Sequence, residues 1–255
     1  MATKFAQHFL INQHAVERIV NAMKLAPQDT VLEIGPGKGA VTALLVEGVQ
    51  RVVVVEIDPQ MVALLKKKLI GSKNVAIIEK DILEFDLSAL PEKEIKVVGN
   101  LPYNLTSPIL RKLSEWTGWS TAFLMVQKEV GDRLCAPAGS SDYGALTVGM
   151  NLTCEIAPVF VLSESSFKPA PRVKSAVVKL TRRAVPLTDN IPAVQRVIQA
   201  AFQQRRKVIL NSLSHGLGLP KEIVEATLEN LKISPQIRPE RIPVSQFIAL
   251  AQQLV

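Results

Sequence analysis

The sequence contains few of the residues that build metal centres and covalent crosslinks. Among its 255 residues are two cysteines and three histidines. Cys135 and Cys154 lack the spacing of a zinc site or a disulfide framework, which indicates a reducing compartment. The histidines are scattered and form no zinc motif. The sequence therefore predicts a protein without a bound metal ion.

Long apolar runs are also missing. No stretch reaches the length of a membrane-spanning helix, and no apolar signal segment follows Met1. With 47% apolar residues the chain can still bury a sizeable core. We therefore expect a soluble, cytoplasmic protein with one large domain, or with a large and a small one.

Positive charge is unevenly distributed along the chain. Residues 1–167 carry 16 basic and 18 acidic side chains, a net charge of −2, whereas residues 168–255 carry 14 and 5, a net charge of +9. A solvated basic surface would explain such an excess, but its concentration favours a polyanionic partner. After about residues 182–190 only helical periodicity appears, at 192–203, 206–213, 221–231 and 244–254. We predict a basic helical domain at residues 183–255.

Earlier in the chain, short apolar runs alternate with helical segments. Strands are predicted at 30–34, 51–56, 75–78, 95–98, 121–126, 155–162 and 175–180. Helices are expected to begin near residues 13, 40, 59, 107 and 127. This alternation is typical of a mostly parallel α/β sheet, here with an antiparallel edge. We assign it to a first domain, residues 1–182, whose strand ends would form the ligand-binding edge.

A glycine-rich loop follows the first long predicted strand. Gly35-Pro36-Gly37-Lys38-Gly39 leads from strand to helix, where glycines let a ligand approach the backbone, although packing alone could require them. Glu56, about 20 residues further on, is placed to accept the ribose hydroxyls of a nucleoside. Pro36 removes a backbone donor that a pyrophosphate would need. A nucleoside without phosphates is favoured, and S-adenosylmethionine (SAM) fits.

Two further strand ends carry polar side chains. Asp81 could accept the exocyclic amine of an adenine resting on Ile57 or Ile82, or it could simply cap a helix. Asn100-Leu101-Pro102-Tyr103 offers a carboxamide, free carbonyls and an aromatic ring, which suit a planar group with an exocyclic amine. The same residues are also common in turns. Because parallel strand ends meet at one edge, we expect these residues to line one site.

Together these motifs resemble those of the SAM-dependent rRNA adenine N6-dimethyltransferases, the family of KsgA and Erm. The resemblance spans nearly the whole chain and includes Ala6–Leu10, Gly35–Gly37, Glu56, Asp81, Asn100–Tyr103, Gln127–Glu129 and Phe167–Ser175. The segment Ala201–Lys207, with Asn211-Ser212-Leu213, is similar to the KsgA branch rather than to Erm. Ala6 replaces a usual glycine, and the basic extension of many members is not seen before it. Either difference could weaken RNA binding.

The resemblance implies a Rossmann-like SAM-dependent methyltransferase sheet followed by a helical rRNA-binding domain. It assigns SAM contacts to His8, Leu10, Gly35, Glu56, Asp81 and Asn100, to which we add Gly37, Ile57 and Ile82. It assigns the target adenine to Asn100, Leu101, Tyr103 and Phe167, and we include Pro102 in this catalytic set. Phe167 by itself is typical of a core residue, but the proline-rich segment around it favours a mobile lid.

Basic residues near the boundary between the two predicted domains form a candidate RNA surface. Gln203–Lys207 is expected to be one helical turn of charge. The candidates for tracking phosphates are Lys174, Arg182, Arg183, Arg205, Arg206 and Lys207. A solvated basic face remains the simpler alternative.

The resemblance implies N6,N6-dimethylation of two adjacent adenosines near the 3′ end of small-subunit (16S) rRNA. The partner would be an assembling 30S particle, and the protein would act as a monomer. Alternatives are an Erm-type methyltransferase of large-subunit rRNA and a catalytically silent ribosome-assembly factor, against which Glu56, Asp81 and Asn100 argue. DNA adenine and protein glutamine methyltransferases use similar loops but do not explain the basic Gln-Arg-Arg-Lys segment.

Overall fold

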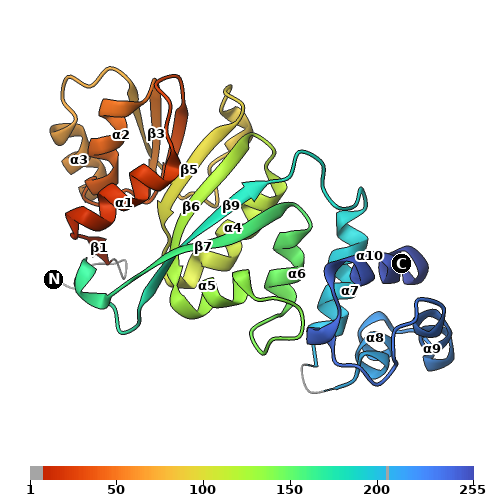
Figure 1. Cartoon of the computed structure of the whole chain (residues 1–255). Coiled ribbons are helices and arrows are strands. Elements are labelled where there is room, and N and C mark those ends of the chain that lie inside the picture. Colours follow the sequence, from red (N-terminus) through yellow and green to blue (C-terminus); the bar gives the residue numbers. More distant parts are fainter. Residues whose placement is uncertain (1–7, 205–206) are drawn as a thin grey trace. The chain divides into compact units, whose positions relative to one another are not determined.

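The computed structural model describes residues 8–204 and 207–255, and seven strands of it form one sheet (Figure 1). Their order is β4-β3-β2-β5-β6-β9-β7. The strands are β2 (Thr30–Ile34), β3 (Arg51–Glu56), β4 (Val75–Glu79), β5 (Ile95–Asn100), β6 (Trp119–Gln127), β7 (Cys154–Leu162) and β9 (Ser175–Arg182). Pairing is parallel from β4 to β6, and β9 runs antiparallel to β6. The predicted mostly parallel sheet with an antiparallel edge is confirmed.

Helices cover both faces of this sheet. Figure 1 shows α1 (Gln13–Met23), α2 (Ala40–Gly48) and α3 (Pro59–Lys68) on one face and α4 (Thr106–Glu115) on the other. Successive strand residues point to opposite faces, so Val52 and Val54 of β3 belong to the apolar cluster that contains residues of α1 to α3. Val53 and Val55 are buried as well. Burial on both sides explains why β3 is almost entirely valine.

The chain separates into two compact units. One comprises the residues up to Gly131 together with Ile156–Arg182, and the other comprises Asp132–Glu155 together with Arg183–Val255. The sequence-based boundary falls at the same place, between 182 and 183, but it left 132–155 in the first domain. No helix within the described residues is long and apolar enough to cross a membrane.

The second unit is helical and has its own apolar core. Its helices are α6 (Ala145–Asn151), α7 (Ile191–Phe202), α8 (Ile209–Leu217), α9 (Lys221–Asn230) and α10 (Val244–Leu254), and α5 (Lys128–Cys135) leads into it. Tyr143, Val148 and Leu152 are buried in the same cluster as Leu213 and Phe247. These apolar partners explain why 132–155 joins the helical unit. Helix α6 was not predicted.

A short second sheet joins the start of the described chain to a later loop. β1 (Phe9–Leu10) pairs antiparallel with β8 (Phe167–Lys168), which places Leu10 opposite Phe167. Phe167 is 3% exposed and belongs to the same apolar cluster as Leu10. The expectation that Phe167 sits on a mobile lid is wrong in this structure, because both strand pairing and core packing hold it.

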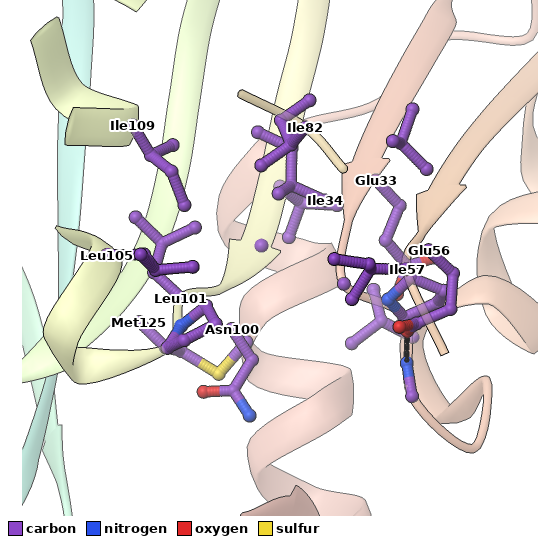
Figure 2. Close-up of a pocket in the computed structure, with 18 of the residues that line it drawn as sticks. Glu33, Ile34, Glu56, Ile57, Ile82, Asn100, Leu101, Leu105, Ile109 and Met125 are labelled. Carbon is purple, nitrogen blue, oxygen red and sulfur yellow. Dashed lines mark hydrogen bonds between the residues drawn. The ribbon is translucent and has the colours of Figure 1, made fainter. Parts of the chain in front are cut away.

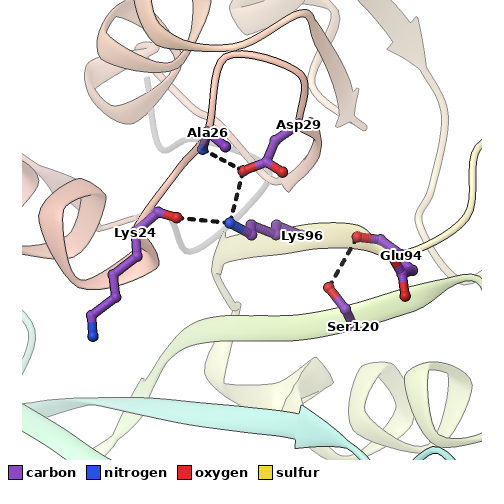
Figure 3. A network of polar contacts seen from close by, with 6 residues as sticks. All are labelled: Lys24, Ala26, Asp29, Glu94, Lys96 and Ser120. Carbon is purple, nitrogen blue, oxygen red and sulfur yellow. Dashed lines mark hydrogen bonds and ion pairs between the residues drawn. The ribbon is translucent and has the colours of Figure 1, made fainter.

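A polar network holds the edge of the sheet where β5 begins (Figure 3). Lys96 Nζ donates to Asp29 Oδ2 at 2.7 Å and to the main-chain oxygen of Lys24 at 2.8 Å. Asp29 Oδ2 also accepts from the N–H of Ala26 at 2.7 Å. The network joins the end of α1 to the start of β5. The other ends of the parallel strands, where β5 finishes at Asn100, are left for a binding site.

Candidate active site

A cavity of about 580 Å³ lies where β2, β3 and β5 end. Its size is within the range of small-molecule sites. Figure 2 shows Glu33 and Glu56 near each other on one side of the cavity, with Asn100 and Leu101 on the other. The cavity is therefore lined by acids on one side and by the Asn100 loop on the other.

The glycine loop and Glu56 are held together by backbone hydrogen bonds. Gly37 has a φ of +54°, and its N–H donates to Glu56 Oε2 at 3.1 Å. The other carboxylate oxygen, Oε1, accepts from the N–H of Asp58 at 3.0 Å. A Cβ at Gly37 would lie 2.8 Å from the ring of Phe9. Glycine is needed here for both its backbone conformation and the space it leaves. Burial is the main cause that raises the pKa of Glu56.

Glu33 is a second acid on the cavity wall, which the sequence analysis did not assign. Its Oε2 accepts a hydrogen bond of 2.6 Å from Thr42 Oγ1 of α2. Burial, with a smaller contribution from the charge of Glu56, raises the pKa of Glu33 to about 7. A carboxylate inside the otherwise apolar strand Thr30–Ile34 was the signal that could have identified it.

The amide of Asn100 has a fixed orientation. Its Nδ2 donates to the main-chain oxygen of His8 at 2.8 Å, and Leu101 N donates to the oxygen of Met125 at 3.1 Å. Among the described residues, none donates to Asn100 Oδ1 or to the Leu101 carbonyl. The loop thus presents two acceptors from adjacent residues.

Tyr103 is held at its ring and at its hydroxyl. The His8 ring stacks on it with centroids 5.8 Å apart and an interplanar angle of 29°. The Tyr103 hydroxyl lies 2.9 Å from Ser175 Oγ, and His8 Nδ1 lies 2.8 Å from the oxygen of Pro169. The N-terminal strand, the Asn100 loop and the loop after β8 therefore meet at this tyrosine.

Asp81 lies at the cavity wall and also accepts a hydrogen bond within its own turn. It lines the cavity, and its Oδ1 accepts from the N–H of Leu83 at 2.8 Å as in a capped turn. Ile57 and Ile82 line the cavity too and are 40% and 8% exposed. They provide apolar surface for a flat ring beside a carboxylate.

The structure thus brings together nearly all of the predicted site residues. The cavity lining includes His8, Leu10, Gly35, Gly37, Glu56, Ile57, Asp81, Ile82, Asn100, Leu101, Pro102 and Tyr103. Phe167 does not line it. The lining also includes Leu105, Ile109 and Met125, which only the tertiary fold brings to this edge.

The candidate RNA residues fall into different environments. Lys174 and Lys207 are exposed. Arg182 Nη1 lies 3.3 Å from the oxygen of Ser114, and Arg183 Nη1 lies 2.9 Å from Glu155 Oε1. These two guanidinium groups thus take part in contacts within the protein.

The prediction of a helical turn at 203–207 is wrong for the described residues of that segment. α7 ends at Phe202 and α8 begins at Ile209, so Gln203, Gln204 and Lys207 lie between helices. Arg205 and Arg206 lie outside the described residues.

Comparison with known proteins assigns the chain to a family. A family model described as ribosomal RNA adenine dimethylase matches residues 1–254. The chain belongs to the ribosomal RNA adenine dimethylase family. Two relatives named ribosomal RNA small subunit methyltransferase A support this assignment. The protein from Janthinobacterium sp. (strain Marseille) is 41% identical, over 98% of this chain and 97% of its own. The protein from Coxiella burnetii (strain Dugway 5J108-111) is 38% identical, over 100% of this chain and 98% of its own length.

Two solved structures resemble this fold over nearly all of the chain. A dimethyladenosine transferase from Plasmodium falciparum is 28% identical with a TM-score of 0.83, over 95% of this chain and 96% of that one. The 23S rRNA methyltransferase ErmE is 29% identical with a TM-score of 0.77, over 96% and 99%. The family and the Rossmann-like methyltransferase fold predicted from the sequence are confirmed, and the protein is an rRNA adenine dimethyltransferase by family.

Proposed function

We propose that this dimethylase transfers two methyl groups from SAM to N6 of each of two adjacent adenosines near the 3′ end of small-subunit (16S) rRNA. It would act as a monomer on an assembling 30S particle in the cytoplasm. The observation that carries this proposal is the pair of acceptors, Asn100 Oδ1 and the Leu101 carbonyl, at the rim of a nucleoside-sized cavity.

The residues of the cavity fit SAM. Glu56 would accept the ribose hydroxyls, and its carboxylate is already oriented by the N–H groups of Gly37 and Asp58. Asp81 would accept the adenine amine, with Ile57 and Ile82 against the faces of the ring. The cofactor would supply a methyl group that is already activated on a sulfonium.

The Asn100 loop would orient the target amine. An exocyclic amine has two N–H groups, and Asn100 Oδ1 and the Leu101 carbonyl can each accept one. Holding both N–H groups fixes the direction of the nitrogen lone pair, so positioning supplies most of the rate acceleration. Tyr103 would stack on the face of a base splayed out of the RNA. No strong base is needed, because the proton can leave to solvent after methyl transfer.

Each compact unit contains basic residues that are candidates for binding RNA. Lys174 and Lys207 are the candidates with exposed side chains, and Arg205 and Arg206 stay candidates on sequence grounds. Arg182 and Arg183, whose guanidinium groups make contacts within the protein, stay candidates on sequence grounds. The charge of +9 in residues 168–255 supports a polyanionic substrate.

An Erm-type activity on large-subunit rRNA is the second candidate, and the similarity to ErmE favours it. The relatives named for the small subunit are 38–41% identical to this chain, against 29% for ErmE. We therefore propose small-subunit rRNA as the substrate ahead of large-subunit rRNA.

The test is transfer of labelled methyl groups from SAM to small ribosomal subunits that lack the modification, beside naked large-subunit rRNA. We expect N6,N6-dimethyladenosine in digests of the small subunit, lost with N100A and kept with N21A, which changes an exposed asparagine of α1 that does not line the cavity. Product on large-subunit rRNA alone would assign the protein to the Erm type. SAM binding without product on either RNA would leave the fold assignment standing and refute the proposed substrate.

A further inference from the structure

We propose that Ser175 is a positioning residue that fixes the ring of Tyr103 for the target base, an inference that rests on the proposed function. The two hydroxyl oxygens lie 2.9 Å apart, although the residues are 72 positions apart in the chain. Ser175 is 1% exposed and does not line the cavity, whereas Tyr103 does. Ser175 would therefore act on the substrate only through Tyr103.

The sheet topology explains how Ser175 reaches the site. Parallel strands bring their last residues to the binding edge, as β5 brings Asn100. β9 runs antiparallel to β6, so its first residue, Ser175, pairs with Gln127, the last residue of β6. Asn100 pairs with Met125 on the other side of β6. One reversed strand thus places a buried hydroxyl beside the loop that follows β5.

The hydrogen bond to Ser175 gives the Tyr103 hydroxyl a role in orienting the ring, and this role is separate from the methyl-transfer step itself. The loop backbone is already fixed, because the Pro102 oxygen accepts from Leu105 N at 2.9 Å and from Thr106 Oγ1 at 3.2 Å. What remains free is the orientation of the ring about its side-chain torsions. Ser175 fixes the far end of the ring, and His8 covers one face. A base can then stack on the opposite face without ordering the tyrosine first.

A purely structural role would give a different result. In that case S175A would lower stability as any lost buried hydroxyl does, without a specific effect on Tyr103. The matched control is S114A, which removes another buried hydroxyl, bonded at 2.7 Å to the oxygen of Arg111 in α4.

The first measurement needs no substrate. The protein contains two tyrosines, Tyr103 and Tyr143, so fluorotyrosine labelling gives two ¹⁹F NMR signals. Tyr143 is buried and donates to the oxygen of Ile242 at 3.0 Å, which makes it an internal reference. We expect S175A to shift the Tyr103 signal alone and S114A to shift neither, with Y103F assigning the spectrum. An unmoved Tyr103 signal in S175A would overturn the proposal.

The second measurement is a double-mutant cycle on methyl transfer. Loss of one neutral hydrogen bond is expected to lower kcat/KM for RNA about fivefold to tenfold in S175A, with SAM affinity unchanged. In the Y103F background the same substitution should have no further effect. Additive losses would refute positioning through Tyr103. If S175A fails to fold, Y103F removes the same hydrogen bond by changing the half-buried Tyr103 in place of the buried Ser175. If the wild type methylates neither rRNA, the proposed function fails while the NMR arm still decides the role of Ser175.

Discussion

The side-chain amide of Asn100 donates a hydrogen bond to the main-chain oxygen of His8, 92 positions earlier in the chain, across 2.8 Å. Because the partner is a main-chain oxygen, many side chains at position 8 could support the same orientation of Asn100. The amide at position 100 donates to this oxygen from its nitrogen, and its own oxygen remains a separate acceptor.

The first prediction concerns N100D. A carboxylate would face the His8 oxygen without a proton to share, so the side chain would turn away and lose its alignment. We expect kcat to fall by about 100-fold or more, the size of effect seen when an oriented catalytic hydrogen bond is removed. Steady-state methyl transfer measures it, and N21D, at an exposed asparagine of α1 that does not line the cavity, should stay within about twofold of the wild type. Comparable losses in both variants would contradict the assignment.

The second prediction concerns Glu33 and pH. Its pKa is raised from 4.5 to about 7, so the folded state binds a proton that the unfolded state has released. The resulting stabilisation is complete below about pH 4.5 and is lost as pH rises through 7. Urea unfolding should show wild-type stability falling relative to E33Q by up to about 3 kcal/mol across this range. Parallel pH curves for the two proteins would show that folding does not raise the pKa of Glu33.

The third prediction compares two ion pairs. Lys96 and Asp29 have side chains 19% and 20% exposed, whereas Arg111 and Glu115 are 72% and 61% exposed. K96M leaves the Asp29 carboxylate largely buried with only the Ala26 N–H, so we expect a loss of about 1–3 kcal/mol in the free energy of unfolding.

R111A is the control for that pair and should cost less than about 0.5 kcal/mol, because solvent screens its partner. SAM affinity should not change in K96M, since Lys96 lies at the start of β5 and Asn100 at its end. Equal losses in K96M and R111A would refute the special role of the buried network.

The fourth prediction concerns RNA binding. K174A and K207A should each weaken binding to all RNA sequences alike and lower the slope of log affinity against log salt by about one. K24A is the matched control, because Lys24 is exposed, lies at the end of α1 (Figure 3) and does not line the cavity. Salt slopes that are unchanged in K174A and K207A would remove these lysines from the RNA surface.

The parts of the fold that the sequence predicted are those with strong local signals. β3 is almost all valine, and Gly35 to Gly39 joins a strand to a helix, so neither depends on distant residues for its recognition. The candidate cavity was predictable for the same reason, since parallel strands ending in Gly35, Glu56 and Asn100 must share one edge.

The parts that were missed depend on distant partners. Tyr143 and Leu152 are apolar residues whose packing partners, such as Phe247, come about 100 residues later. Phe167 was expected on a lid because prolines follow it, but Leu10 pairs with it across the short sheet. Glu33 and Ser175 acquire roles only when α2 and the Asn100 loop are folded against them.

The grouping of residues 132–155 with the C-terminal helices has a consequence for synthesis. At about 5–20 residues per second, the ribosome needs roughly 5–20 seconds to extend the chain from Leu152 to Phe247. During that interval the apolar side chains of Tyr143 and Val148 have been made but their partners have not. The nascent chain thus exposes an apolar segment, which is prone to aggregation, while the sheet around it assembles. Fusions or truncations that end near residue 182 would make this temporary exposure permanent, and they should aggregate unless residues 132–155 are removed as well.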